Sequence, residues 1–149
     1  MRAVVQRTRH SQVVIAGAKT AAIGTGLMVL LGIKQGDTIA DADYMMEKIL
    51  NLRIFQDSAG KMNLSLLEIK GEVLMVSQFT LYGDARKGRR PSFTAAENPD
   101  AAGKLFAYCI DYIAEKGVAV QTGQFGEDMQ VLIENDGPCT ILLDSERAF

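Results

Sequence analysis

Three polar residues directly follow an apolar run and are the first candidates for chemistry. Residues 73–76 are all apolar and are expected to form a buried strand, and Ser77, Gln78 and Thr80 crowd the point where that strand should end. Catalytic and binding residues are common at strand ends and in the loops that follow them. An edge strand with polar residues on its outer face would give the same pattern, so this segment alone leaves both interpretations open.

A second candidate is the run Asn-Asp-Gly-Pro-Cys-Thr at residues 135–140, which lies between the strand-like stretches 129–133 and 141–143. Pro138 has no N–H to give to a sheet, so it marks a turn or an edge. Gly137 has no Cβ, so its backbone can approach another molecule closely. The run is either an ordinary hairpin turn or a rigid piece of backbone that presents its carbonyl and N–H groups to a ligand. Its combination with residues 77–80 favours the second interpretation.

Basic side chains cluster around a glycine a few residues beyond Thr80: Arg86, Lys87, Arg89 and Arg90. Such a cluster is usually a solvated loop. The net charge of −2 gives the protein no global attraction to nucleic acid, so any contact with phosphates must come from a local patch of this kind. The closeness of the cluster to Thr80 favours a role in phosphate binding.

Several kinds of active site lack support in the sequence. The single histidine, His10, lies in a polar stretch that we expect to be a surface turn, and no nucleophile elbow, zinc motif, phosphate loop or dinucleotide fingerprint is present. We therefore expect no metal and no cofactor. Backbone N–H groups around Phe79 and Thr80 are the candidates for stabilising an oxyanion. Covalent attack by Thr80 stays open as an alternative, although no base to activate it is visible.

The positions of glycine, proline and apolar residues predict an α+β fold. Helical apolar spacing predicts one helix that is capped by Thr38 and ends near Leu52, and a second that begins after Asn98 at Pro99 and ends at Gly117. Strands are expected at residues 3–6, 12–15, 21–23, 27–33, 53–56, 72–79, 118–121, 129–134 and 140–143. This content predicts a curved, mostly antiparallel sheet or open barrel with two main helices packed on it, in one domain, 1–149.

The two polar runs together resemble the D-aminoacyl-tRNA deacylase family, of the D-tyrosyl-tRNA deacylase type. The resemblance covers nearly the whole chain and includes residues 1–7, 48–55, 86–93 and 126–145. It implies a homodimer, with active sites at the subunit interface, that hydrolyses the ester bond of D-aminoacyl-tRNA. It also implies hydrolysis of glycyl-tRNA mischarged on tRNA-Ala, and a 2′-hydroxyl of the terminal adenosine that assists the reaction.

The same resemblance assigns roles to individual residues. The catalytic residues it implies are Ser77, Gln78, Phe79 and Thr80. The Gly137–Pro138 bond would be cis, and it would enter the partner subunit's active site, where its carbonyl oxygens hold the amino group and leave no room for an L side chain. The resemblance also implies that Arg7, Met129 and Asn135 anchor the Gly137–Pro138 segment, line the pocket or support it. The tRNA would be bound by Arg86, Lys87, Arg89 and Arg90.

Two other classes of function stay open from the residues alone. A non-catalytic RNA-binding module would use the basic loop and nearby aromatic residues, and an enzyme of small-molecule metabolism would use the same loop for a phosphate or carboxylate. The chain has two cysteines, no signal-peptide pattern and no apolar run near the length that spans a bilayer. We therefore expect a cytoplasmic protein that does not contact membranes.

Overall fold

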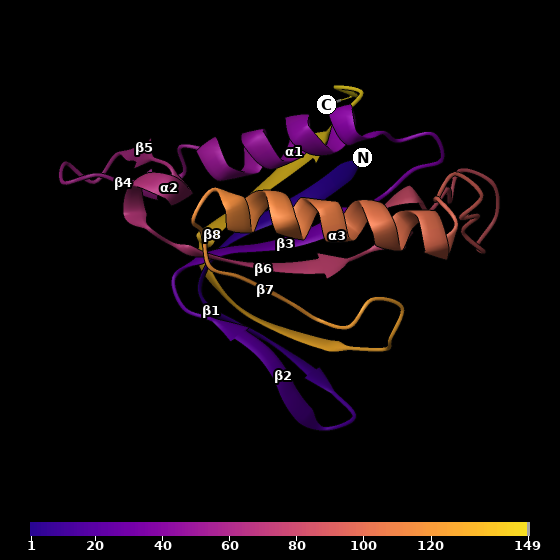
Figure 1. Ribbon diagram of the computed structural model, residues 1–149, viewed down its shortest axis with the longest axis horizontal. Helices are drawn as coiled ribbons and strands as arrows, with labels where there is room; N and C mark the ends of the chain where they lie inside the picture. The colour runs from indigo at the N-terminus through magenta and orange to yellow at the C-terminus, as the bar shows by residue number, and fades with distance from the viewer. Residues whose placement is uncertain (149) are drawn as a thin grey trace.

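The computed structural model describes residues 1–148, and a mixed sheet curves through its centre (Figure 1). The strand order is β2–β1–β3–β6–β7, and β8 pairs with β1. Antiparallel pairing joins β1 to β2, β3 and β8, whereas β3–β6 and β6–β7 are parallel. The strands are β1 (Arg2–Ile15), β2 (Ala18–Ile23), β3 (Gly26–Gly32), β6 (Glu72–Ser77), β7 (Val120–Thr122) and β8 (Gln130–Asp144), with a separate pair β4 (Phe55–Gln56) and β5 (Met62–Leu64).

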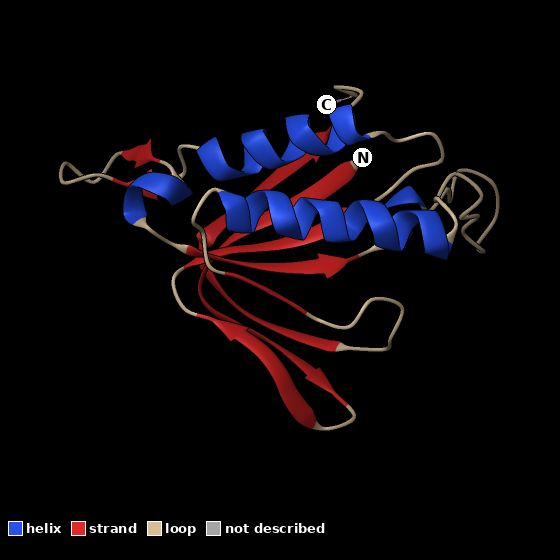
Figure 2. Ribbon diagram, in the orientation of Figure 1, coloured by secondary structure: helices blue, strands red, loops and turns tan. Residues whose placement is uncertain are grey.

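Two long helices cover the same face of the sheet (Figure 2). They are α1 (Ile39–Asn51) and α3 (Pro99–Glu115), and two short segments, α2 (Leu66–Ile69) and the 3₁₀ helix η1 (Phe79–Tyr82), complete the helical content. Both long helices begin at a cap: Asp41 accepts hydrogen bonds from the backbone N–H and hydroxyl of Thr38, and Asn98 Oδ1 accepts from the Ala101 N–H at 3.0 Å. Within residues 1–148, no helix has the length and apolar character needed to cross a membrane.

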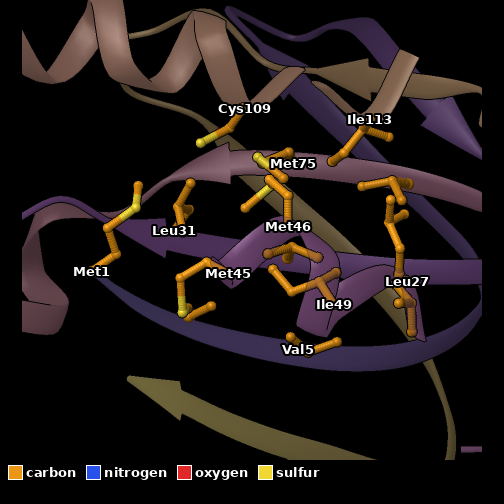
Figure 3. Packing of buried hydrophobic residues seen from close by; sticks show 14 of the residues in the cluster. Met1, Val5, Leu27, Leu31, Met45, Met46, Ile49, Met75, Cys109 and Ile113 are labelled. Atoms are coloured by element: carbon orange, nitrogen blue, oxygen red, sulfur yellow. The ribbon is translucent and has the colours of Figure 1, made fainter. Parts of the chain in front are cut away.

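The main core lies between the helices and the sheet (Figure 3). Met45, Met46 and Ile49 of α1 are fully buried in one cluster with Met75 of β6 and with Cys109 of α3. Burial raises the pKa of the Cys109 thiol to about 12, so this side chain stays protonated and takes no part in nucleophilic chemistry at neutral pH. A smaller cluster fills the other side of the sheet: Val13, Ala21, Ile23, Met28, Leu74 and Val76.

The α+β class, the curved sheet and both main helices agree with the expectation from the sequence. The strand boundaries differ in several places, and β4 and β7 begin two residues later than expected. Residues 7–11 do not form a turn, because β1 runs unbroken through them and carries His10 within the strand. Residues 135–140 do not form a hairpin turn either, because β8 continues along β1 on both sides of them. The strand expected at 72–79 ends at Ser77, where η1 follows, and the short elements β5 and α2 were not predicted.

Buried polar side chains explain why β1 is continuous. Thr8 and Ser11 have no exposed surface, and their hydroxyl oxygens are 2.8 Å apart. Thr8 Oγ1 also accepts a hydrogen bond from the His10 N–H (3.1 Å) and lies 2.9 Å from the Glu134 carbonyl oxygen of β8. Polar residues that predict a turn by composition are therefore satisfied inside the sheet.

Shortening a core methionine tests the packing of α1. Met46 is fully buried, whereas Met62 of β5 is 62% exposed and serves as the matched control. Met46→Ala should lower the free energy of unfolding by about 2–5 kcal/mol because it leaves a cavity, and Met62→Ala by about 0.5 kcal/mol or less. Urea unfolding at one fixed protein concentration measures both, and equal losses would contradict this account of the core.

Candidate functional site

The end of β6 meets two loops and the first turn of α3 at one end of the molecule, on the right in Figure 1. Two adjoining clefts open there and share Ser77, Phe79 and Gly126. The aromatic cleft, of about 400 Å³, is lined by Ile33, Ser77, Phe79, Phe93, Ala96, Glu97, Pro99, Ala102, Phe125 and Gly126. The strand-end cleft, of about 280 Å³, is lined by Val76, Ser77, Gln78, Phe79, Gly126, Glu127, Asp128, Met129 and Val131.

Phenylalanine rings dominate the first of these clefts. Phe79 is 55% exposed, and its ring packs edge-on against Phe93 with the centroids 5.2 Å apart. Phe125, on the loop between β7 and β8, packs against Phe106 of α3 with the ring centroids 5.7 Å apart. Exposed aromatic faces fixed by such contacts bind flat ring systems by stacking.

Unpaired backbone donors lie where β6 passes into η1. The Gln78 N–H makes the last bond to β3, to the Leu31 carbonyl at 2.8 Å, and the chain then turns into the 3₁₀ helix. The first N–H groups of a helix have no acceptor within it. Among residues 1–148, the N–H groups of Phe79 and Thr80 have no hydrogen-bond acceptor, so both are free to donate to a ligand oxygen.

The Thr80 hydroxyl has one hydrogen-bond partner among the described residues, the side-chain amide of Gln78, which donates to it. An amide donor withdraws electron density from the oxygen and takes no proton from it. His10 lies in β1 and lines neither cleft. The geometry therefore gives Thr80 no general base and suits it to positioning.

Residues 135–140 form a bend in the middle of β8, and Arg7 of β1 holds it. The register of the two strands shifts opposite this bend, and the Gly137–Pro138 peptide bond is cis. Arg7, which is 8% exposed, donates from Nε to the Asp136 carbonyl at 3.3 Å and lies 3.2 Å from its carboxylate, and its Nη1 donates to the Ile54 carbonyl. Gly137 has a φ of +117°, and a Cβ there would lie 2.9 Å from Arg7 Nη2, so only glycine fits.

Gln6 holds both flanks of the same bend. Its Oε1 accepts a hydrogen bond from Asn135 Nδ2 at 2.9 Å and another from the Thr140 hydroxyl at 2.7 Å. Gln6 was not predicted as a functional residue, because its partners lie more than a hundred residues away in the sequence. Phe125, Glu127 and the other cleft residues of the loop between β7 and β8 were also missed, because they lie far in the sequence from the rest of the cleft.

The structure brings some of the predicted residues together and separates others. Ser77, Gln78, Phe79 and Met129 line the strand-end cleft, and Thr80 follows them in η1. The bend, Arg7 and Asn135 line neither cleft. Residues 77–80 and residues 135–140 were predicted to act together, but within a single chain they lie apart.

The basic residues lie on an exposed loop whose base is closed. Backbone bonds between Asp84 and Ser92, of 2.7 and 2.9 Å, join its two ends. Arg86 forms an ion pair with Asp84, in which Arg86 Nη2 lies 2.7 Å from Asp84 Oδ2. This hydrogen bond holds the pKa of the Asp84 carboxyl well below its usual range. In the described part of the chain, Lys87, Arg89 and Arg90 have no carboxylate partner and project as free positive charges.

Comparisons with known proteins agree on one family. A family model described as D-Tyr-tRNA(Tyr) deacylase matches residues 4–144. D-aminoacyl-tRNA deacylases of Syntrophomonas wolfei and Thermosipho melanesiensis are 64% and 55% identical to this chain, and each match covers the whole of both chains.

Solved structures show the same architecture. A c-Myc DNA unwinding element binding protein superposes with a TM-score of 0.91 at 40% identity, over 97% of this chain and 98% of that one. A probable eukaryotic D-amino acid tRNA deacylase superposes with a TM-score of 0.79 at 21% identity, over 95% and 97%, and this match supports the fold alone.

Replacing Gln6 tests how the bend is held. Gln6→Leu removes both accepted hydrogen bonds, whereas Gln6→Glu keeps an oxygen that accepts them. If the pair contributes about 1 kcal/mol, amides of residues 134–141 should exchange with deuterium about fivefold faster in Gln6→Leu. Peptide-resolved hydrogen exchange by mass spectrometry makes the measurement. Equal protection in Gln6→Leu and the parent, or equal loss in both variants, would show that Gln6 does not hold the bend.

Proposed function

The chain belongs to the D-Tyr-tRNA(Tyr) deacylase family, and from this premise we propose how its site hydrolyses the ester bond of D-aminoacyl-tRNA. The enzyme is a hydrolase that acts on ester bonds, and it releases a D-amino acid and free tRNA. The observation that carries the mechanism is the pair of free N–H groups at Phe79 and Thr80, beside a cleft in which no base is hydrogen-bonded to the Thr80 hydroxyl among residues 1–148. We assign this activity to the cytoplasm, where aminoacyl-tRNA is used.

Catalysis in this proposal rests on the backbone. The ester carbonyl lies over the N–H groups of Phe79 and Thr80, which stabilise the oxyanion as it forms, and the loss of one such donor typically costs about 10²–10³ in rate. Gln78 orients the Thr80 hydroxyl, which positions the ester or the attacking water. The 2′-hydroxyl of the terminal ribose, next to the scissile bond, assists the proton transfers, since no base is hydrogen-bonded to the Thr80 hydroxyl among residues 1–148.

The aromatic cleft suits the terminal adenosine. It adjoins the strand-end cleft through Ser77 and Phe79, as the base must adjoin the ester. Phe79, Phe93 and Phe125 offer faces for stacking an adenine ring, a contact worth about 1–3 kcal/mol per base. Glu97 on the wall of the cleft is a hydrogen-bond acceptor for an amino group of the base.

Selection of the D form requires a second subunit in this proposal. The bend carries Gly137 and Pro138 on an exposed surface and lies outside its own chain's clefts. The β8 edge opposite β1 has no strand partner among residues 1–148, and it exposes Leu132 (46%) and Leu142 (55%), which favours association of two copies. Each bend then enters the partner's strand-end cleft, where its carbonyl groups hold the amino group and its bulk excludes an L side chain.

Comparing matched esters tests the proposed function. D-aminoacyl-tRNA and glycyl-tRNA mischarged on tRNA-Ala should both be hydrolysed, because neither places a side chain against the bend, and the L ester should resist. Pro138→Ala should reduce the preference for D over L esters at least about tenfold, since the ring no longer fixes φ in the bend. Rates of amino-acid release from the three esters measure this. Binding of the tRNA without release of the amino acid would indicate a non-catalytic RNA-binding module instead.

Removing the Thr80 hydroxyl separates positioning from covalent attack in the same assay. Loss of a true nucleophile costs on the order of 10⁶ in rate, whereas loss of a positioning group costs far less. Thr80→Ala should keep its rate within about tenfold to a hundredfold of the parent. Thr20→Ala, on exposed β2, is the control for threonine loss. Complete inactivity of Thr80→Ala with a native fold would contradict the positioning role and favour the covalent route.

Salt dependence tests the basic loop. If Lys87, Arg89 and Arg90 each contact one phosphate, the slope of log affinity against log salt should be about −2, at about 0.7 per contact for single strands. Changing all three residues to alanine should flatten the slope toward zero, whereas alanines at exposed Lys19 and Lys61 should not change it. Tight binding with a salt-independent affinity in the parent protein would remove the role of this loop.

A further inference from the structure

Residues 92–97 form a wall of the aromatic cleft, and a third, polar cleft lies on the other side of this wall. This polar cleft has a volume of about 580 Å³ and lies among Arg2, Lys34, Tyr82, Asp84, Ser92 and Glu146. Along the wall, Ser92 lines the polar cleft and Phe93 the aromatic one. The short helix η1 divides in the same way, with Phe79 on one side and Tyr82 on the other.

Charges of both signs line this polar cleft in ion pairs. Arg2 Nε lies 2.9 Å from the Asp144 carboxylate, and Lys34 pairs with Glu146. A site for a bare anion would present cations without carboxylates beside them. Donors and acceptors placed side by side instead suit a ligand that itself carries alternating hydrogen-bond donors and acceptors, as the edge of a nucleobase does.

Tyr82 is the second observation that indicates a ligand. It is 6% exposed, and its hydroxyl has no hydrogen-bond partner among residues 1–148. A buried hydroxyl without a partner is costly, and burial raises its pKa, so the group keeps its proton and remains a donor. The Arg2 guanidinium lies over the Tyr82 ring at 4.8 Å, and its side chain is 36% exposed, so it offers a flat cationic surface for stacking.

Building on the proposed function, we propose that the polar cleft binds the nucleotide that precedes the terminal adenosine of tRNA and reads the edge of its base. That nucleotide is a cytidine, whose amino group donates to a carboxylate such as Glu146 and whose ring nitrogen and carbonyl accept from Lys34 or Arg2. Adjacent nucleotides of a single strand then occupy the two clefts on either side of residues 92–97. Unstacked bases at single-stranded ends are the part of RNA that proteins read most directly.

A series of minimal esters tests this directly. The substrates are D-aminoacyl-adenosine, the same ester on the dinucleotides CpA and UpA, and full D-aminoacyl-tRNA. For the parent protein, kcat/KM should rise about tenfold from the adenosine ester to the CpA ester, with a smaller gain for UpA, because uridine offers no amino group to the carboxylate. Equal rates for the adenosine and CpA esters overturn the proposal, and so does an equal gain for CpA and UpA, since contacts to the backbone alone cannot distinguish the bases.

Variants of the polar cleft link the gain to its residues. Lys34→Met and Tyr82→Phe should each remove most of the CpA gain through KM, while the fold is checked by thermal unfolding. Lys48→Met, whose ammonium lies over Tyr44 on α1, is the matched control and should keep the full gain. A CpA gain that both cleft variants retain overturns the assignment to this cleft. Failure of the parent protein to hydrolyse any D ester would instead refute the proposed function itself.

Discussion

β1 is hydrogen-bonded along both sides, and this constraint sets the position of every functional segment. β3 and β2 share one side of β1, and β8 runs along the other for almost its whole length. The ladder to β8 has register shifts around Thr8, whose hydroxyl accepts a hydrogen bond from the His10 N–H. Because the pairing resumes on both sides of this point, the bend at residues 135–140 can move only if a long ladder is broken. A loop joining two strands would have no such restraint.

In the proposed mechanism, peptide groups carry the chemistry of the site, and side chains hold these peptide groups in place. Free N–H groups at Phe79 and Thr80 follow from the change of β6 into η1, while the buried guanidinium of Arg7 holds the Asp136 carbonyl of the bend. Groups that are already oriented cost no reorganisation when charge develops during a reaction. A substrate that brings its own hydroxyl next to an activated ester suits such a site, because orientation is then the main requirement.

Local signals in the sequence predicted the helices, and long-range contacts decided the rest. Caps and helical spacing lie within a few residues of each other, so the helices that begin after Thr38 and Asn98 were predicted nearly to their ends. The turn expected around His10 was wrong because Thr8 finds polar partners in Ser11 and in distant β8. Proline in residues 135–140 indicated a break, yet the strand resumes after it. Within one chain the bend lies outside the clefts at the end of β6, so the association of these two segments stays a prediction.

The wall between the aromatic and polar clefts is itself fixed to the sheet. Gln35 donates to the Ala95 carbonyl and Glu97 to the Ile33 carbonyl, both at 3.0 Å, which ties residues 92–97 to the end of β3. Phe93 fixes the same wall to Phe79. These contacts fix the position of one cleft relative to the other. Binding energy from a remote part of the substrate can be used to hold the ester over the N–H groups, so a free amino-acid ester would gain little from this site. In the proposed mechanism, this rigid wall makes the polynucleotide end, and not only the handedness of the amino acid, a condition for hydrolysis.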